Sequence, residues 1–307
     1  MSNMKMDSDT EMLAIVIPFY KAKFFDATLK SLSAQTDKRF KVYIGDDSSP
    51  DDITKMLDNY REHFCFEYKR FEENLGKKAL PRQWERCVKM TAGEEWIVLL
   101  GDDDVLGDGV VAAFYKNISL KANAINSIRY ASCTIDENGV QTSKVFFNPT
   151  IESAIDFFFR KQRSSLSEYI FKVSKINQVG FKNFELGWCS DILAVLEFSD
   201  FGAVYSINEA LVNVRISSQS ISGNQDNHKL KFKAAFRFLY YLIANKKAYF
   251  SDFQQKKILE EMSKVYLNQK KNLFFFAKVS TQYWIRGLFR EYCIFILSFF
   301  KIVFKTK

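Results

Sequence analysis

The sequence predicts an α/β protein whose central, mostly parallel sheet is flanked by helices and is followed by a helical C-terminal extension. Three observations indicate this fold. Apolar runs of strand length alternate with amphipathic segments over the first hundred residues, the runs are apolar enough to be buried on both faces, and acidic clusters follow two of them. Ligands of such sheets bind beyond the carboxyl ends of the strands, so both acidic clusters should face one crevice.

The first half of the chain contains four predicted strands with helices between them. The first helix places Phe25, Leu29 and Leu32 on one face, and Asp51-Asp52 supplies a cap for the second helix. The predicted strands are Leu13–Pro18, Phe40–Gly45, Cys65–Phe71 and Glu95–Leu100, and the helices are Phe24–Gln35, Ile53–His63 and Arg82–Met90.

After Gly109 the pattern is less regular. A polar turn at residues 136–139 follows one strand, and beyond Ser222 the chain is helical. The predicted strands are Ile128–Ile135, Ser167–Val173 and one or two within Ala203–Ser217, and short helices end at Phe157–Arg160 and span Ile192–Phe198.

The charge of the chain is divided unevenly. Residues 225–307 carry 17 Lys or Arg and 5 Asp or Glu, a balance of +12, whereas the preceding 224 residues have a balance of −4. The extension is also rich in aromatic residues, which favours an anionic membrane surface as its partner; packing on the body of the protein, or on a second subunit in a homo-oligomer, is the alternative. The apolar block Tyr292–Phe304 disfavours nucleic acid, and it is too short and too interrupted by Lys301 to span a bilayer.

Cysteine usage and the N-terminus bear on the compartment. The five cysteines are odd in number and widely spaced, which indicates a reducing environment without a disulfide framework or a zinc cluster. Residues 1–12 are polar and lack the apolar core of a secretion signal. We expect a cytoplasmic protein that is peripheral on the inner face of the cell membrane.

The most informative stretch is Gly101-Asp102-Asp103-Asp104, directly after the apolar run Trp96–Leu100. Three adjacent carboxylates at the end of a buried strand repel each other unless a cation is held there. Oxygen ligands suit Mg²⁺ or Mn²⁺, and a metal chelated by a nucleotide diphosphate would satisfy the cluster. The alternative is an acidic turn that caps the next helix.

Six motifs in order resemble one known family. They are Ile15-Val16-Ile17-Pro18-Phe19-Tyr20, Gly45-Asp46-Asp47-Ser48-Ser49, Asn74-Leu75-Gly76, Gln83-Trp84-Glu85-Arg86-Cys87, Gly93-Glu94-Glu95-Trp96-Ile97 and Gly101-Asp102-Asp103-Asp104. Together they resemble family 2 of the glycosyltransferases, over about residues 12–222. The resemblance implies a glycosyltransferase-A fold in residues 1–224, with a nucleotide-sugar-binding half at 1–110 and an acceptor half at 111–224, ahead of the extension at 225–307.

The resemblance implies a site for a nucleotide-diphosphate sugar, with UDP favoured. Asp47 is the first candidate for contact with the base and Asp46 the second, because a carboxylate can accept the imide proton of uracil; a capping turn is the alternative for this pair. Two arginines are candidates for the diphosphate, since a guanidinium binds phosphate bidentately. The remaining candidates are Pro18, Phe19 and Tyr20 at the nucleotide and Arg82 and Arg215 at the diphosphate.

The acidic cluster matches the metal motif of the family. By resemblance Asp103 is the direct ligand of Mn²⁺ or Mg²⁺, Asp102 contacts the ribose or the metal through water, and Asp104 supports or ligates. The family commonly has Asp where this chain has Gly101, so the division of roles among the three carboxylates stays open.

Sugar transfer with inversion also needs a general base for the acceptor hydroxyl. The family takes it from an acidic motif at the start of a helix, and Trp188-Cys189-Ser190-Asp191 fits with Ser190 in place of the usual Glu. Asp191 is therefore the predicted catalytic base, with a helix cap as the alternative. Trp188 is the predicted acceptor platform, with a buried core tryptophan as the alternative.

The sequence thus predicts an inverting, metal-dependent transferase that moves one sugar to a saccharide or lipid-linked saccharide acceptor in bacterial capsule, O-antigen or related polysaccharide synthesis. The Gln-x-x-Arg-Trp motif of processive relatives is absent from the sequence. A non-catalytic relative that binds sugar nucleotides or acts as a scaffold is the main alternative. A sugar-nucleotide nucleotidyltransferase lacks support because no glycine-rich loop follows the first strand, and a receiver domain would leave residues 125–307 unexplained.

Overall fold

The computed structural model describes residues 13–118, 125–218, 220, 221, 223, 227–268 and 272–304. The prediction that no secretion signal is present concerns residues 1–12, which lie outside the described residues. The chain divides into two compact units: Met1–Asn183 with Asp191–Asn224, and Phe184–Ser190 with Gln225–Lys307.

The first unit is built on a nine-stranded sheet in the described part of the chain, with strand order β3-β2-β1-β4-β8-β6-β9-β5 and with β7 paired to β9. Strands β1 to β4 are parallel, β8 is antiparallel to both of its neighbours, and β6 and β9 are parallel to each other. Most of the sheet therefore runs in one direction, as predicted. The strands are β1 (Leu13–Phe19), β2 (Lys41–Asp46), β3 (Cys65–Arg70), β4 (Trp96–Leu99), β5 (Val105–Leu106), β6 (Ser127–Ile135), β7 (Ile151–Ser153), β8 (Tyr169–Lys172) and β9 (Ala203–Arg215).

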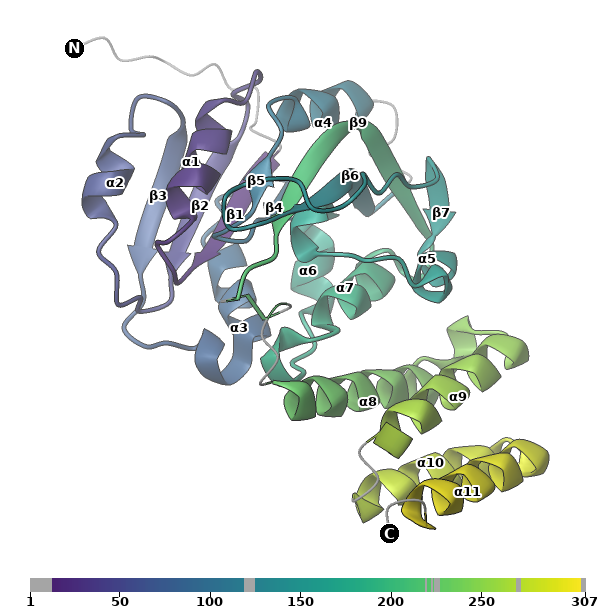
Figure 1. Cartoon of the computed structure of the whole chain (residues 1–307). Helices are drawn as coiled ribbons and strands as arrows, with labels where there is room; N and C mark the ends of the chain where they lie inside the picture. The colour runs from purple at the N-terminus through teal and green to yellow at the C-terminus, as the bar shows by residue number, and fades with distance from the viewer. Residues whose placement is uncertain are drawn as a thin grey trace. The chain divides into compact units, whose positions relative to one another are not determined.

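Helices flank this sheet, as Figure 1 shows. The helices of the first half are amphipathic, and α1 buries Phe25, Leu29 and Leu32, the face that the sequence predicts. The α-helices up to residue 198 are α1 (Phe25–Ser33), α2 (Thr54–Asp58), α3 (Gly76–Val88), α4 (Val110–Ile118), α5 (Ala154–Arg160), α6 (Val173–Val179) and α7 (Ser190–Phe198).

The parallel register brings the ends of three strands to the same edge of the sheet. Phe19 at the end of β1 pairs with Asp46 at the end of β2, and the amide of Leu100, just after β4, donates to the carbonyl of Val16 on β1 at 2.9 Å. The core beneath is apolar, and β1 is almost fully buried. Both acidic clusters therefore start at one edge, as the βα pattern predicts.

Several boundaries differ from the predictions. Helix α3 begins at Gly76 instead of Arg82, and it is kinked: Ala79 leaves the helical region with φ −155° and ψ 75°, shortly before Pro81. Helix α2 ends at Asp58 instead of His63. The helices α4 and α6 and the short strands β5 and β7 were not predicted. Strands of two or three residues carry no periodic signal, and these two form by pairing with β9.

The second unit is helical in its described residues, as predicted for the extension. Its four α-helices beyond residue 227 are α8 (His228–Asn245), α9 (Asp252–Asn268), α10 (Leu273–Ile285) and α11 (Phe289–Phe304). No helix in the described residues has the length and apolar character needed to cross a bilayer. None of the five cysteines, all of which lie in the described residues, forms a disulfide.

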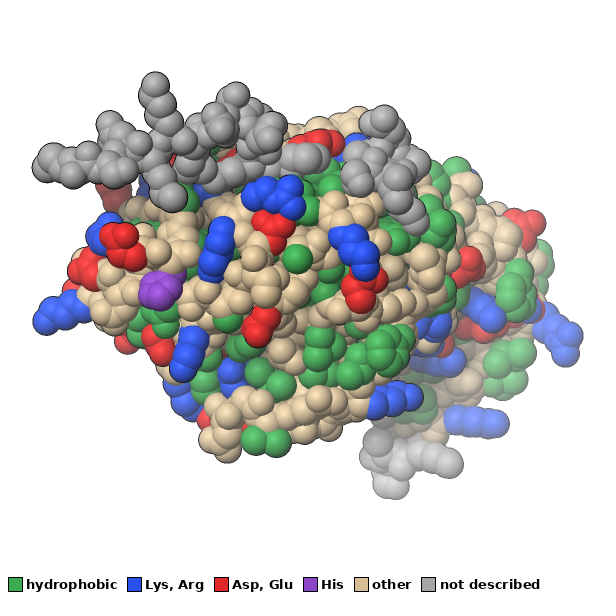
Figure 2. Space-filling view, turned by 90° about the horizontal axis from the view of Figure 1, so that it is seen from above, with side chains coloured by type: hydrophobic (Ala, Val, Ile, Leu, Met, Phe, Trp, Pro, Cys, Tyr) green, Lys and Arg blue, Asp and Glu red, His purple; other side chains and the backbone are tan. Residues whose placement is uncertain are grey.

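Positive and negative side chains are mixed on the face of the molecule drawn in Figure 2. On the face in Figure 2, Lys and Arg side chains are interspersed with Asp and Glu, and hydrophobic side chains lie in groups between them. The charge imbalance of the sequence does not appear as a one-sign surface on this face.

Candidate active site

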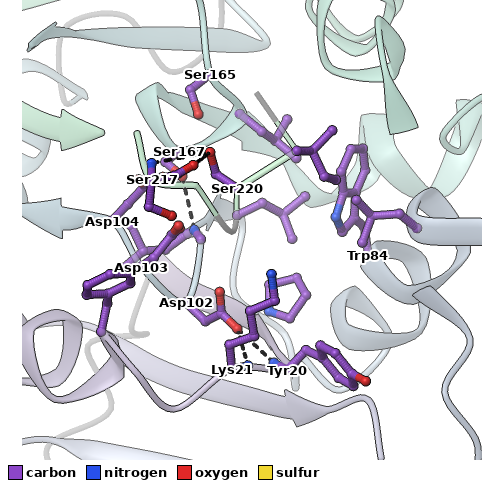
Figure 3. Close-up of a pocket in the computed structure, with 18 residues that line it drawn as sticks. Tyr20, Lys21, Trp84, Asp102, Asp103, Asp104, Ser165, Ser167, Ser217 and Ser220 are labelled. Atoms are coloured by element: carbon purple, nitrogen blue, oxygen red, sulfur yellow. Dashed lines mark hydrogen bonds between the residues drawn. The ribbon is translucent and has the colours of Figure 1, made fainter. Parts of the chain in front are cut away.

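A cavity of about 310 Å³ opens at the carboxyl ends of β1 and β4, within the first unit. Its walls come from the segments after these two strands, from α3 and from two serine-containing segments, 165–167 and 217–221. Figure 3 shows Tyr20 and Lys21 on one side, the three aspartates beside them and Trp84 across the cavity. The lining residues are Pro18, Tyr20, Lys21, Phe24, Leu80, Trp84, Leu99, Leu100, Gly101, Asp102, Asp103, Asp104, Ser165, Leu166, Ser167, Ser217, Ser220 and Ile221.

The acidic cluster forms a tight turn that separates its three carboxylates. The amide of Asp104 donates to the carbonyl of Gly101 at 3.3 Å, which closes the turn. The carboxylate of Asp102 accepts the backbone amides of Tyr20 and Lys21, both at 2.8 Å, and so ties the end of β4 to the end of β1. Asp102 and Asp103 occupy the central positions of the turn, and Asp104 is its last residue.

Asp104 is held from behind the cavity. Its carboxylate accepts the hydroxyl of Ser167 and, at 2.8 Å, the backbone amide of Arg215. The Ser167 hydroxyl in turn accepts the amide of Gly101 at 3.0 Å. Both carboxylate oxygens of Asp104 thus accept hydrogen bonds from the protein, and its role toward a metal remains a prediction.

Asp103 is the carboxylate that remains for a ligand. No described residue other than Asp103 itself donates a hydrogen bond to its side chain, and it lines the cavity. Its pKa is raised to about 8, mainly by burial and in addition by the negative charges of Asp104 and Asp102, against the opposing effect of Arg215. Burial also raises the pKa values of Asp102 and Asp104, although their hydrogen bonds oppose the shift. The cluster therefore favours a positive partner at Asp103.

The geometry of the turn explains why Gly stands at position 101. A Cβ atom built there would lie 2.9 Å from Oδ2 of Asp104 and 3.1 Å from Oδ1 of Asp103. A side chain at this position would displace the carboxylates that the turn sets apart.

The other acidic pair lies outside the cavity lining. Asp46 is fully buried, and its carboxylate accepts the Tyr68 hydroxyl at 2.6 Å, the Arg70 guanidinium at 2.9 Å and the Ser49 amide at 2.7 Å. Through these contacts Asp46 holds the loop after β2 in place. Its predicted contact with the base remains a prediction.

Asp47 is tied to the start of α3. Its carboxylate accepts the amides of Leu75 and Gly76, both at 2.8 Å, and pairs with the guanidinium of Arg86. Burial raises its pKa, and these donors oppose the shift. The N-terminus of a helix and a guanidinium stabilise a charged Asp47, whose contact with the base also remains a prediction.

The sequence motifs around this pair interlock in space. A Cβ on Gly76 would lie 2.6 Å from Oδ2 of Asp47, and a Cβ on Gly45 would lie 2.3 Å from Sγ of Cys87. The Gln83 side chain donates to the Gly45 carbonyl at 2.9 Å. Three motifs that are separate in the sequence are therefore one packed unit, in which glycine is required for close approach.

The residues after β1 divide between core and cavity. Pro18 and Tyr20 line the cavity, whereas Phe19 is fully buried and its ring centroid lies 4.7 Å from that of Phe25. This alternation follows from the period of two along a strand. Pro18 and Tyr20 therefore face the cavity and Phe19 packs in the core; the predicted nucleotide contacts of these three residues remain predictions.

The two predicted diphosphate arginines do not line the cavity. Arg82 pairs with Glu85 at 2.6 Å on the exposed side of α3. Arg215 is buried: its guanidinium donates to the carbonyls of Asp103 at 2.9 Å and Asp136 at 2.6 Å, so it holds the acidic turn in place. Lys21 is the basic residue among the described lining residues, and neither its type nor its spacing distinguished it in the sequence.

Asp191 stands at the first turn of α7 and is outside the cavity lining. Burial raises its pKa to about 6, and the backbone amides at the helix start and the charge of Arg163 oppose this shift. Arg163 also pairs with the buried Glu168, and its charge opposes the rise in the pKa of Asp104. This arginine therefore acts on three carboxylates, but no motif in the sequence marked it.

Trp188 belongs to the second unit, which includes Phe184–Ser190. It is half-buried, and Nζ of Lys231 lies 4.9 Å from the centroid of its ring, a cation–π arrangement. Its predicted role as an acceptor platform stays a prediction.

The residues of the cavity fit a metal that is held by one carboxylate together with phosphates of a substrate. The described residues contain no cluster of three or more His, Cys, Asp or Glu placed to hold one ion. Mg²⁺ is commonly held by one or two carboxylates together with substrate phosphates, and Mn²⁺ shares this preference for oxygen. A single carboxylate, that of Asp103, faces the cavity without a donor from another described residue, so the donor set fits an ion that arrives with a diphosphate.

Comparison with known proteins gives one family and one recurrent fold. Residues 14–181 match the model of Glycosyl transferase family 2. The structure of S. aureus TarS 1-349 in complex with UDP-GlcNAc matches with a TM-score of 0.65 and 14% identity, over 88% of this chain and 79% of that one. TarS 1-349 in complex with UDP gives 0.55 and 14% over 91% of each chain, and S. aureus TarS gives 0.59 and 15% over 83% and 43%. No curated protein sequence matches.

Proposed function

Because more than half of its length matches the family model, the chain belongs to glycosyl transferase family 2, and we propose that it moves one sugar from a UDP-sugar to an acceptor hydroxyl with inversion. The fold is the glycosyltransferase-A fold that the resemblance implied, with a mostly parallel sheet and a helical C-terminal region. The chain is accordingly a glycosyltransferase; donor, metal and stereochemistry are the proposal.

The observation that carries the proposal is the placement of Asp103. Its buried carboxylate faces a cavity at the carboxyl ends of parallel strands, where ligands of open α/β sheets bind. The volume, about 310 Å³, is at the lower end of the range for small-ligand sites. Complexes of TarS with UDP-GlcNAc and with UDP support a donor of this class.

In this proposal Asp103 holds Mn²⁺ or Mg²⁺ together with the donor diphosphate, and the ion would neutralise charge on the leaving group. Asp102 and Asp104 fix the turn that presents Asp103, and Arg215 secures it from behind. Lys21 lies at the cavity wall, where an ammonium can contact a phosphate. The predicted ribose contact of Asp102 uses the side of its carboxylate that Tyr20 and Lys21 leave open.

We assign Asp191 as the general base. A carboxyl group with a pKa of about 6 is ionised at neutral pH and is a stronger base than an ordinary aspartate. It takes the proton of the acceptor hydroxyl as that oxygen attacks the anomeric carbon and the diphosphate leaves. The acceptor class that we propose is a saccharide or lipid-linked saccharide of a bacterial surface polysaccharide.

The test is calorimetric titration of the protein with UDP and UDP-sugars, with and without Mn²⁺. Replacing Asp103 by Asn should weaken Mn²⁺-supported UDP binding about 10- to 100-fold, the loss expected for one charged contact. The matched control is Asp108→Asn, an exposed aspartate four residues after Asp104, which should bind as the wild type does. Equal affinities of all three proteins would remove the metal-ligand assignment.

Turnover separates the enzyme from a non-catalytic relative. Release of UDP from a UDP-sugar in the presence of saccharide acceptors supports transfer. Tight binding of the donor with no turnover against a broad acceptor panel would indicate the sugar-nucleotide-binding relative instead.

A further inference from the structure

The last two helices of the second unit present large apolar side chains to solvent. Trp284 and Ile285 at the end of α10 are 58% and 68% exposed, and Leu297 on α11 is 61% exposed. Phe289, Ile294 and Phe300 are also exposed. Exposed apolar side chains that occur singly are ordinary, but a run of them on consecutive helices marks an interaction surface.

Helix α11 is apolar on both of its sides. On the inner side, the ring of Phe295 lies 5.9 Å from that of Tyr266 and the ring of Phe299 lies 5.2 Å from that of Phe276, between centroids. On the outer side, Ile294 and Leu297 follow each other at helical spacing and are exposed. Neighbouring apolar side chains left exposed on the outer side favour a partner there.

Basic side chains stand at both ends of the outer side. Arg290, Ile294, Leu297 and Lys301 share one face of α11, since they are spaced by four, three and four residues, and Arg290 and Lys301 are exposed. The one acidic residue of α11, Glu291, is engaged by Nζ of Lys256 at 2.6 Å. Long basic side chains can extend past an apolar strip to reach charged groups above it.

An aromatic corner joins the two helices. The ring centroid of Trp284 lies 5.1 Å from that of Phe289 and 6.0 Å from that of Tyr292. Tryptophan combines a large apolar ring with one polar N–H group, and it is enriched where a bilayer meets water.

We propose that the outer face of α10 and α11, with Trp284, Phe289, Ile294, Leu297 and Phe300, binds the surface of an anionic lipid bilayer. The 16 residues of α11 extend about 24 Å, less than the hydrocarbon core of about 30 Å, so the helix lies along the surface. The balance of +12 over residues 225–307 supplies the attraction to anionic headgroups.

The same charge argues against a second copy on this face. Two copies that met through it would each bring the strongly basic segment to the interface, and like charges at an interface oppose association. A lipid surface instead provides both the apolar layer and the negative charge. The binding is independent of the proposed sugar transfer.

The experiment is flotation of the full-length protein with vesicles of phosphatidylcholine alone or with about 30% phosphatidylglycerol. We expect flotation with the anionic vesicles, little with the neutral ones, and a reduced bound fraction in about 0.5 M salt. Leu297→Glu should weaken partitioning about tenfold or more, because it places a charge in the apolar strip. Ile151→Glu is the matched control: its side chain is 62% exposed on β7 of the first unit, and the change in charge is the same.

Two further measurements keep the result interpretable. Leu297→Glu should keep the melting temperature of the wild type, since the side chain is exposed, and Trp284 fluorescence should be quenched by brominated acyl chains. The proposal is overturned if the wild type does not float with anionic vesicles, or if both Glu variants float equally. It is also overturned if sedimentation without lipid shows that the wild type is an oligomer and that Leu297→Glu dissociates it.

Discussion

Replacing Gly76 by Ala is a severe test of how the site is assembled, although the change adds one methyl group. Gly76 is the first residue of α3, a position where Ala is ordinarily acceptable or favourable. A Cβ there would lie 2.6 Å from Oδ2 of Asp47, a distance that carbon and oxygen atoms do not tolerate without bonding. Asp47 is 4% exposed and is held by the amides of Leu75 and Gly76.

The cost follows from the choices open to Asp47. If its carboxylate moves away, it gives up the 2.8 Å bond to the Gly76 amide, and loss of a hydrogen bond to a charged group costs about 1.5–3 kcal/mol. If it stays, overpacking costs about 1–3 kcal/mol. The gain from a less flexible unfolded chain is about 0.4–1 kcal/mol. We expect a net destabilisation of about 1–2 kcal/mol and a fall in melting temperature of about 2–8 °C.

The assay is thermal unfolding followed by tryptophan fluorescence, with Gly109→Ala as the control. A Cβ on Gly109 meets nothing within 4 Å, so this variant should change stability by no more than about 1 kcal/mol. In an Asp47→Ala background the clashing oxygen is gone, and Gly76→Ala should then be nearly neutral. The reasoning fails if Gly76→Ala is as stable as the wild type, or if its cost persists in that background.

The remaining predictions concern catalysis and the acidic turn. Asp191→Asn should lower turnover by at least about 100-fold with donor affinity unchanged in calorimetry; lost donor binding would assign Asp191 a structural role. Because the base must be ionised and its pKa is raised to about 6, the rate of UDP release by the wild type should fall as the pH drops below about 6. The same acidic fall in the rate of Asp191→Asn would contradict the assignment. Ser167→Ala removes a donor to the buried Asp104 and should cost about 1–2 kcal/mol in melting experiments, against less than about 0.5 for the neighbouring Ser165→Ala. Without Ser167 the raised pKa of Asp104 rises further, so the loss should be larger at high pH, where the carboxylate is ionised, than at low pH; a pH-independent loss would point to packing alone.

Local patterns sufficed for the first half of the fold. The apolar runs at 13–18, 40–45 and 95–100 became β1, β2 and β4 because a strand buried on both faces must be apolar throughout. The spacing of Phe25, Leu29 and Leu32 likewise predicted the buried face of α1. The short strands β5 and β7 were not predicted, since their conformation depends on pairing with β9, about 50 to 110 residues away.

The sequence also identified the family and the three adjacent aspartates, because metal and phosphate chemistry restricts which residue types can stand at a strand end. Which aspartate is available was decided by tertiary structure. The donors that engage Asp102 come from Tyr20 and Lys21, and those that engage Asp104 come from Ser167 and Arg215. These partners are 63 to 111 positions away in the chain, so no spacing rule can reveal them. Hydrogen bonds satisfy two of the carboxylates, whereas Asp103 is buried without such a donor and is the one that we propose as the metal ligand.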